Sequence, residues 1–437
     1  MRDLWDSLPV LAQDITIAIA LLLPLLLIGV LLLRGFRPFP LIRALLWRFR
    51  WANLLFVLLI ATSVGMGIGL IAQERGLRVG TARAASKFDM VVSAPGSELT
   101  MMMAAVYLQA SDVPLLDGAA YDLIANHPQV KIAAPIAFGD SYNGAPVVGT
   151  IADFVTYLSD DRIEGRLFRK SGEAVVGAAA GLKVGDSFTP QHGHGASADD
   201  EAHEGFKIEV VGLLPRTGSP WDRAVLIPVE TVWEVHGLAN GHAFDEGDRI
   251  GPPFDPALFP GTPAVIVRAK ELWANYALRS EFTRKGEMMA FFPGTVLSNL
   301  YRVMGDVRQA MSVMSVVTQV LVAASVLLGL FILSRLFQRQ LAMLRALGAP
   351  RRFVMAVVWG YGVALLMAGT VLGLVFGLGA ASVLSQVVTA RTDILVTAGI
   401  GWPEITLALA FLSATSVLSL IPAVIVLARP IVESLRA

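Results

Sequence analysis

Five stretches of this chain carry no charged side chain over at least 19 consecutive residues. A helix of about 20 apolar residues crosses the hydrocarbon core of a bilayer, so each stretch is long enough to span a membrane. The sequence therefore predicts an α-helical membrane protein with four core spans and one extra span near the N-terminus, within residues 1–33. The predicted spans are residues 15–33, 51–72, 309–334, 353–390 and 405–428.

The arginines indicate how these spans are oriented. Residues 34–50, 335–352 and 429–437 together contain twelve arginines and one acid, Glu433. The rest of the chain then holds 23 basic and 34 acidic residues. Because basic residues favour the cytoplasmic side of short loops, we expect these three segments inside and the N-terminus outside. Residues 34–50 are expected to form a basic elbow helix in the membrane interface, and residues 429–437 a cytoplasmic tail.

Residues 73–308 are predicted to form one large domain outside the membrane. The chain is 55% hydrophobic and 16% charged, which is too apolar for a soluble protein and too charged in its middle for an all-membrane one. Helical patches such as Ala119–Ala125 alternate here with short β-like runs, so an α+β fold is expected. Both ends of the region have a helical pattern and are predicted to be stalks that continue a span. The β-like runs are Asp89–Ser93, Lys131–Phe138, Pro146–Ile151, Lys207–Leu214, Ala224–Val229 and Ala264–Arg268.

The first span could instead be a signal peptide. Three acids, Asp3, Asp6 and Asp14, precede it, and RGFRPFP follows it without a small-residue cleavage site. Signal peptides have a basic start and a small-residue cleavage site, so we favour a retained helix.

Glycines in two spans predict close helix packing, because small residues let helix backbones approach each other. Gly65 and Gly69 form a GxxxG pair in the second span. Residues 353–390 contain Gly360, Gly362, Gly369, Gly373, Gly377 and Gly379.

Residues 335–352 are predicted to be a basic amphipathic helix at the cytoplasmic membrane surface. Apolar residues recur there at spacings of three and four, and the charged residues are five arginines without an acid. Gly348 and Pro350 are expected to end the helix. The pattern favours a contact surface for a partner.

This segment also resembles a known family. RQLAMLRALGAPRR, residues 339–352, is similar to the loop between the second and third core helices of ABC-transporter permeases of the MacB/FtsX/lipoprotein-release type. In that family the loop is a coupling helix that docks into a separate ATPase subunit. Gln340 stands where the family often has an acid. The resemblance implies ATPase coupling by Arg339, Leu341, Leu344, Arg345, Leu347, Gly348, Arg351 and Arg352.

The resemblance extends into the predicted outer domain. SKFDMVVSAPGS, residues 86–97, is similar to the start of the extracytoplasmic domain of MacB-like permeases. Residues 172–188 and 207–233 look like a second module of the same domain.

Motifs for chemistry within the chain are absent from its sequence. There is no G-x-x-x-x-G-K-[ST] loop for a nucleotide and no G-x-S-x-G motif for a nucleophile. None of the predicted spans contains a charged residue, which argues against an ion-coupled carrier. We therefore expect a membrane subunit that is not an enzyme and binds no cofactor itself, with ATP on a partner chain.

A metal site is a separate hypothesis. His192, His194 and His203 lie near four acids in the segment QHGHGASADDEAHEG, and imidazoles with carboxylates suit zinc. The alternative is a solvated loop, because no helical histidine pair sets a metal geometry there.

The predicted function is that of a permease subunit of an ABC system in the bacterial inner membrane, with its large domain facing the periplasm. By resemblance, ATP hydrolysis on a separate ATPase subunit would move that domain to export or extract a peptide, lipoprotein, lipid or drug. The implied partners are the ATPase, a second permease copy in a homodimer, a periplasmic adaptor or outer-membrane component, and membrane lipids, but no nucleic acid. The alternatives are an FtsX-like regulator that transports nothing and a membrane-anchored metal sensor.

Overall fold

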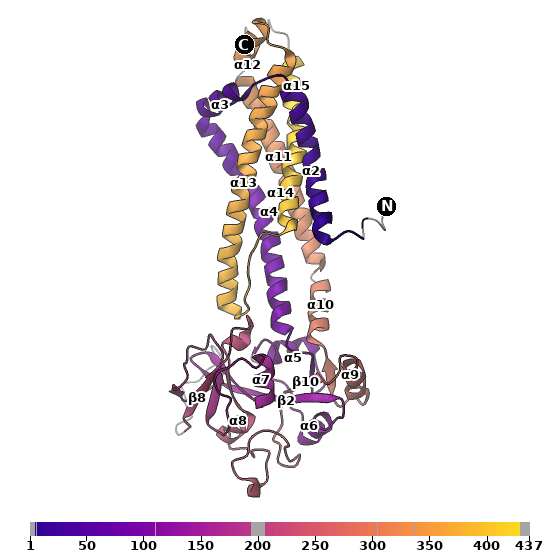
Figure 1. Ribbon diagram of the computed structural model, residues 1–437, viewed down its shortest axis with the longest axis vertical. Coiled ribbons are helices and arrows are strands. Elements are labelled where there is room, and N and C mark those ends of the chain that lie inside the picture. Colours follow the sequence, from indigo (N-terminus) through magenta and orange to yellow (C-terminus); the bar gives the residue numbers. More distant parts are fainter. Residues whose placement is uncertain are drawn as a thin grey trace. The chain divides into compact units, whose positions relative to one another are not determined.

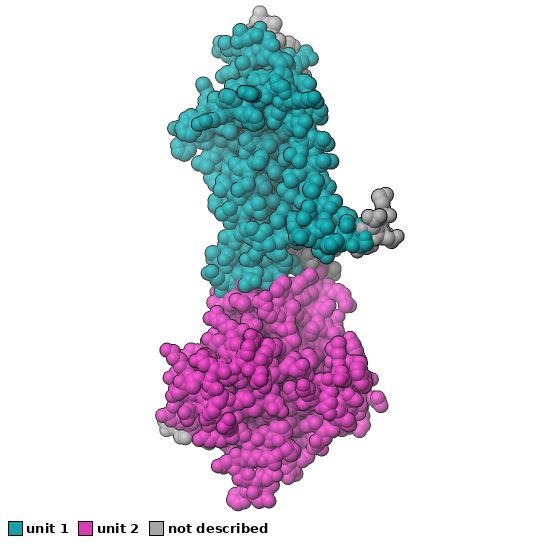
Figure 2. All heavy atoms as spheres, in the orientation of Figure 1, with its two compact units in different colours: residues 1–77, 306–387, 397–437 teal, residues 78–305, 388–396 magenta. Residues whose placement is uncertain are grey.

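The computed structural model of the chain describes Trp5 and residues 7–109, 111–193, 206–303, 305–336 and 338–428. The chain forms two compact units, coloured separately in Figure 2. The helical unit comprises residues 1–77, 306–387 and 397–437, and the α+β unit comprises residues 78–305 and 388–396. The predicted tail, residues 429–437, lies outside the described residues.

Long apolar helices make up the helical unit (Figure 1). Among the described residues, four helices are long and apolar enough to cross a membrane: Val10–Leu33, Arg50–Ala85, Arg351–Thr392 and Trp402–Ile425. The helices that contribute to the unit are α2 (Val10–Leu33), α3 (Phe39–Arg48), α4 (Arg50–Ala85), α11 (Gly305–Leu336), α12 (Gln338–Ala346), α13 (Arg351–Thr392), α14 (Trp402–Leu418) and α15 (Leu420–Ala428).

Four of the five predicted spans lie in these apolar helices. The fifth, residues 309–334, falls in α11, of which Val316–Gly329 forms an apolar stretch too short to count with the other four. The predicted elbow in residues 34–50 is the helix α3. Helix α2 packs along α14 and α13, so the extra N-terminal helix is part of the bundle (Figure 1).

The last predicted span begins inside a longer helix. Helix α14 begins at Trp402, three residues earlier than expected, and therefore includes Glu404. Pro403 favours an early start because its φ suits the first helical turn. The Glu404 side chain is fully buried, and its Oε2 accepts a 2.8 Å hydrogen bond from Gly401 N. Its Oε1 lies 3.3 Å from Arg75 Nη2 of α4, so this acid is paired within the helical unit.

The predicted glycine packing is confirmed between α4 and α13. A Cβ atom on Gly377 would lie 2.5 Å from the carbonyl oxygen of Gly65, and one on Gly65 would lie 3.0 Å from that of Gly373. Only glycine lets the two backbones approach this closely. In contrast, a Cβ atom on Gly379 would meet nothing within 4 Å.

An 11-stranded sheet forms the core of the α+β unit, with the order β11-β1-β10-β2-β3-β9-β5-β8-β4 and two further short strands, β6 and β7, paired at its side. All six predicted runs are strands: β1 (Met90–Ser93), β2 (Val130–Tyr142), β3 (Ala145–Thr150), β8 (Ile208–Leu213), β9 (Val225–Pro228) and β10 (Ala264–Ala269). The strands missed from the sequence are β4 (Glu164–Gly165), β5 (Glu173–Val176), β6 (Ser187–Phe188), β7 (Gln191–His192) and β11 (Met289–Phe291). Four of these five, β4, β6, β7 and β11, have only two or three residues, too few for an alternating pattern to show.

The α-helices that accompany the sheet in the described part of this unit are α5 (Glu98–Ala105), α6 (Gly118–Ala125), α7 (Ala152–Leu158), α8 (Val229–Val235), α9 (Ala274–Arg284) and α10 (Pro293–Val303). Helix α6 confirms the predicted patch at Ala119–Ala125. Helix α4 continues without a break to Ala85, so the helical pattern at the start of residues 73–308 is continuous with the second predicted span. On the other side, α10 ends at Val303 and α11 begins at Gly305.

Candidate functional site

The predicted contact loop is the short helix α12 and the turn that follows it. Gly348 has φ +94°, a left-handed conformation that favours glycine. Its N–H donates to the carbonyl of Arg345 (3.1 Å), and Ala349 N donates to the carbonyl of Leu344 (2.9 Å). These two bonds form a Schellman motif, which satisfies the last carbonyls of the helix. The predicted helix stop at Gly348 is therefore confirmed, and α13 begins directly after Pro350.

The leucines of this loop do not form one outward face, which corrects the interpretation from the sequence. Leu341 is only 4% exposed and belongs to the hydrophobic core of the helical unit, against which Leu344 also packs. Leu347 is 85% exposed. Each residue of a helix is rotated by about 100° around the axis from the residue before it, so Leu347 lies roughly 240° around the axis from Leu341. The nine-residue helix uses its inner leucines to hold itself against its own spans.

Two of the loop arginines bind the chain itself. Arg345 Nη1 donates to the carbonyl oxygen of Leu427 in α15 at 3.3 Å. Arg352 Nη2 donates to the carbonyl oxygen of Leu31 in α2. Both acceptors lie near the end of an apolar helix, where carbonyls lack intrahelical partners. These bonds anchor the loop to the bundle.

The outward side of the loop is both basic and apolar. Arg339 and Arg351 are exposed, as are Met343 and Leu347. Gln340 is exposed beside them. This side can contact an acidic surface that has an apolar pocket, whereas Leu341 and Leu344 cannot take part without leaving their own core.

A second contact, missed from the sequence, lies where α13 ends. Arg223 Nη1 lies 2.9 Å from Asp393 Oδ2, and Leu395 N donates to the carbonyl oxygen of Gly218 at 3.1 Å. Burial raises the pKa of the Asp393 carboxyl, and the Arg223 guanidinium opposes this shift. These contacts make residues 388–396 part of the α+β unit.

The described residues contain no group of three side chains able to hold a metal ion. Of the zinc candidates, His194 and His203 lie outside the described residues, and His192 is placed only by its backbone, at the end of β7. The zinc hypothesis therefore stays a prediction.

A buried acid and histidine form a further pair that the sequence did not reveal. His242 Nε2 lies 3.4 Å from Glu230 Oε1, and both side chains are only 1% exposed. Glu246 lies 3.2 Å from the other ring nitrogen of His242. Burial raises the pKa of Glu230, which backbone N–H groups and His242 offset in part. Because the two carboxylates face opposite ring nitrogens, they fix the ring and the loop that carries it, and do not converge on a common ion.

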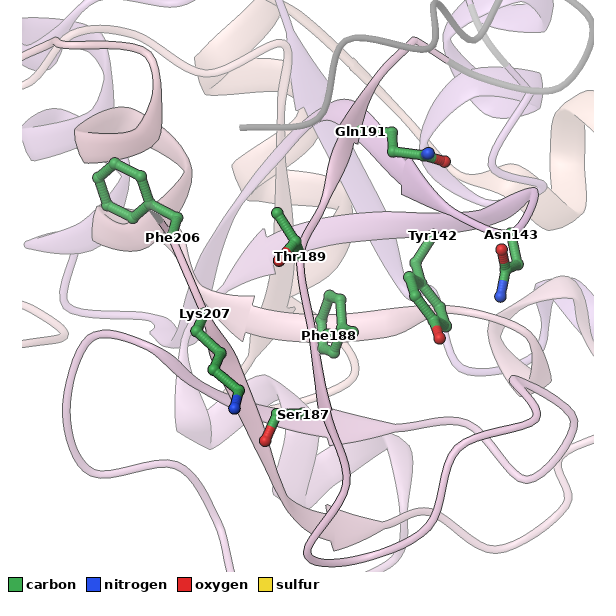
Figure 3. Close-up of a pocket in the computed structure, with 8 residues that line it drawn as sticks. All are labelled: Tyr142, Asn143, Ser187, Phe188, Thr189, Gln191, Phe206 and Lys207. Carbon is green, nitrogen blue, oxygen red and sulfur yellow. The ribbon is translucent and has the colours of Figure 1, made fainter. Parts of the chain in front are cut away.

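The α+β unit has a hollow of about 490 Å³. Figure 3 shows the residues that line it. Strand β6 supplies Phe188, whose ring centroid lies 5.0 Å from that of Tyr142 in β2. Lys207 is the one charged residue among the described lining residues. A lone lysine without an acid or histidine beside it offers no acid–base pair, so we assign no catalysis to this hollow.

One comparison with known proteins covers the basic loop, residues 335–352. Residues 312–431 match the family model described as FtsX-like permease C-terminal. The match contains α12, α13 and α14 entirely, and therefore the whole loop. None of the curated proteins compared with the chain matches it.

Two solved structures are similar to part of the chain. The periplasmic region of MacB from Actinobacillus actinomycetemcomitans is 11% identical with a TM-score of 0.31, over 50% of this chain and 95% of that one. The extracellular domain of the noncanonic ABC-type transporter YknZ from Gram-positive bacteria is 11% identical with a TM-score of 0.27, over 46% and 98%. TM-scores this low do not establish a common fold.

The family match and the apolar helices together define the class of protein. The chain is a membrane protein with a large polar domain besides its spans. Residues 312–431 match the C-terminal domain of FtsX-like permeases, in agreement with the predicted resemblance to the MacB/FtsX type.

Proposed function

We propose that the chain is the membrane subunit of an ABC system and couples ATP hydrolysis on a separate ATPase to movement of its α+β unit outside the membrane. The observation that carries this proposal is helix α13. It begins directly after the basic loop, within the FtsX-like match, and continues unbroken to Thr392, beside Asp393 and its contacts with the α+β unit. A rigid helix of 42 residues is suited to carry a displacement from one end to the other.

The ATPase contact is the outward side of the loop. Arg339, Met343, Leu347 and Arg351 are its exposed residues, and the inner leucines keep the helix seated. Pushing on α12 therefore displaces the bundle, because Arg345 and Arg352 tie the loop to α15 and α2.

Besides α13, helix α4 also connects the helical unit to the α+β unit. Its residues belong to both units, and the glycine contact with α13 joins the two helices by their backbones. We infer that α4 and α13 move together. The substrate would be a peptide, lipoprotein, lipid or drug handled outside the membrane, with a second permease copy and a periplasmic adaptor or outer-membrane component as further partners.

The orientation follows from the arginines: the N-terminus and the α+β unit lie outside, in the periplasm, and the basic loop lies inside, with the chain in the bacterial inner membrane. In this arrangement the ATPase binds ATP and this chain binds none. The alternative, an FtsX-like regulator that activates an extracytoplasmic partner without transport, uses the same coupling and differs only in the outer partner.

Co-purification of the full chain with its ABC ATPase partner tests the contact surface. Leu347→Asp should weaken binding a hundredfold or more, because an unpaired carboxylate enters an apolar contact at a cost of several kcal/mol. Leu272→Asp is the matched control, since Leu272 is 84% exposed but lies in the α+β unit. Gly348→Val should keep binding and lose coupled ATP hydrolysis, because valine strains the left-handed turn that aims the loop.

Normal binding and activity of Leu347→Asp would remove this surface from the proposal. Equal loss in Leu272→Asp would show a general defect in place of a lost contact.

A further inference from the structure

An apolar groove runs along the helical unit between α2, α3 and α13. Its volume is about 530 Å³, within the range of roughly 300–1,000 Å³ typical of ligand pockets. All its lining residues are apolar or glycine; Leu26 and Gly29 come from α2, Phe39 from α3, and Trp359 and Ala364 from α13. The groove is separate from the ATPase contact and from the α4–α13 glycine contact.

Small residues and a fixed tryptophan keep the groove open. The indole N–H of Trp359 donates to the carbonyl oxygen of Ser416 at 3.0 Å, which holds the ring in place. A Cβ atom on Gly29 would already lie 3.4 Å from that ring. Ala364 contributes only a methyl group. A long apolar ligand therefore meets a preformed surface.

Three arginines lie close in sequence to lining residues, around the turn from α2 to α3. Arg34 follows the lining residue Leu33, and Arg43 follows the lining residue Ile42. Arg37 lies two residues before Phe39, and all three arginines are exposed. The sequence contains no acid between Asp14 and Glu74, or between Asp306 and Asp393, to offset them. An apolar groove with a cationic end is complementary to one kind of membrane molecule, a lipid with an acyl chain and an anionic head group.

We propose that this groove binds one anionic phospholipid of the surrounding membrane. One of its acyl chains lies between α2 and α13, and its phosphate is held by Arg34, Arg37 and Arg43. The bound lipid holds the N-terminal helix α2 against the core span α13. This site rests on the chain being a membrane protein and is independent of the ATPase.

The test is native mass spectrometry of the purified full chain with equal amounts of dioleoyl phosphatidylglycerol and dioleoyl phosphatidylcholine. The wild type should retain one phosphatidylglycerol in preference to phosphatidylcholine. Ala364→Trp fills the groove and should lower this retention at least tenfold. Ala368→Trp is the matched control, because Ala368 is exposed about one turn further along α13 and does not line the groove.

A second set of variants tests the head-group site. Replacing Arg34, Arg37 and Arg43 together by glutamine should remove the preference for phosphatidylglycerol, whereas Arg48→Gln with Arg50→Gln should keep it. Inorganic phosphate should not displace the lipid; displacement would show a free-phosphate site in place of a lipid site.

Equal retention of both lipids by the wild type overturns the proposal, as does retention by Ala364→Trp. If Ala364→Trp instead loses a bound second copy of the protein, then protein, and not lipid, fills the groove. If Ala364→Trp does not purify as one species, the triple arginine variant decides: an unchanged preference refutes the site. None of these readouts involves the ATPase, so the proposed coupling stands or falls separately.

Discussion

The backbone contact between α4 and α13 predicts that a single methyl group at Gly377 destabilises the bundle. A Cβ atom there would lie 2.5 Å from the carbonyl oxygen of Gly65, whereas ordinary contacts begin at 3.4 Å. The helices must therefore separate by about 0.9 Å, and the atom in the way is backbone that no rotamer change can move. Overpacking of this kind costs about 1–3 kcal/mol.

The gain in helix propensity works in the opposite direction. Replacing glycine by alanine inside a helix stabilises it by about 1 kcal/mol. Gly377→Ala should thus be neutral to about 2 kcal/mol destabilising, taking both effects together. Gly379→Ala on the same helix isolates the propensity gain, because a Cβ atom there meets nothing within 4 Å. The two variants should therefore differ by about 1–3 kcal/mol.

The assay is unfolding of the full chain in one detergent, followed by the loss of helical circular dichroism. Gly379→Ala should unfold at or above the wild-type midpoint, and Gly377→Ala several degrees below Gly379→Ala. If Gly377→Ala were as stable as Gly379→Ala, the two helices would not be in backbone contact, and their proposed common movement would lose its basis.

Three further predictions concern charge. Two 2.7 Å hydrogen bonds from Arg166 hold the pKa of Glu173 at about 2, below its ordinary 4.5. This pair therefore stabilises the fold above about pH 4.5, and the contribution is lost as the pH falls towards 2. Glu173→Gln should reduce the fall of the unfolding midpoint in that pH window, and an unchanged slope would contradict this. Asp393→Asn should lower the free energy of unfolding by at most ~1 kcal/mol, because its ion pair with Arg223 is partly exposed. In a double-mutant cycle with Arg223→Gln the two effects should not add, and additive effects would mean that the pair contributes nothing to stability. Tags at residue 1 and near residue 196 should be reached by a membrane-impermeant label, and a tag at residue 437 should not. Labelling of the tag at residue 437 and not of the other two would mean that the topology is reversed.

The spans and most strands could be predicted because their signals are local. A charge-free run of about 20 residues has few stable states other than a membrane helix, since backbone groups in lipid must bond within the helix. The stop at Gly348 is equally local, because a left-handed residue followed by proline ends a helix whatever surrounds it. Helix α14 begins three residues before the predicted span, because the charge of Glu404 ended the apolar run whereas Pro403 suits the first turn of a helix.

The candidate site depended on contacts between distant parts of the chain. Spacing shows that Leu341 and Leu347 repeat helically, but only the packed bundle decides that Leu341 is covered and Leu347 is not. Arg223 and Asp393 are 170 residues apart, and Arg352 and Leu31 are 321 apart. Charge patterning alone cannot choose such partners, because each arginine has many candidate acceptors of equal chemistry. The sequence by itself therefore determined the helices, their order and the basic loop. The tertiary structure decided which side of the loop faces outward and which helices enclose the apolar groove, because a helix face is covered by a neighbouring element that residue spacing does not identify.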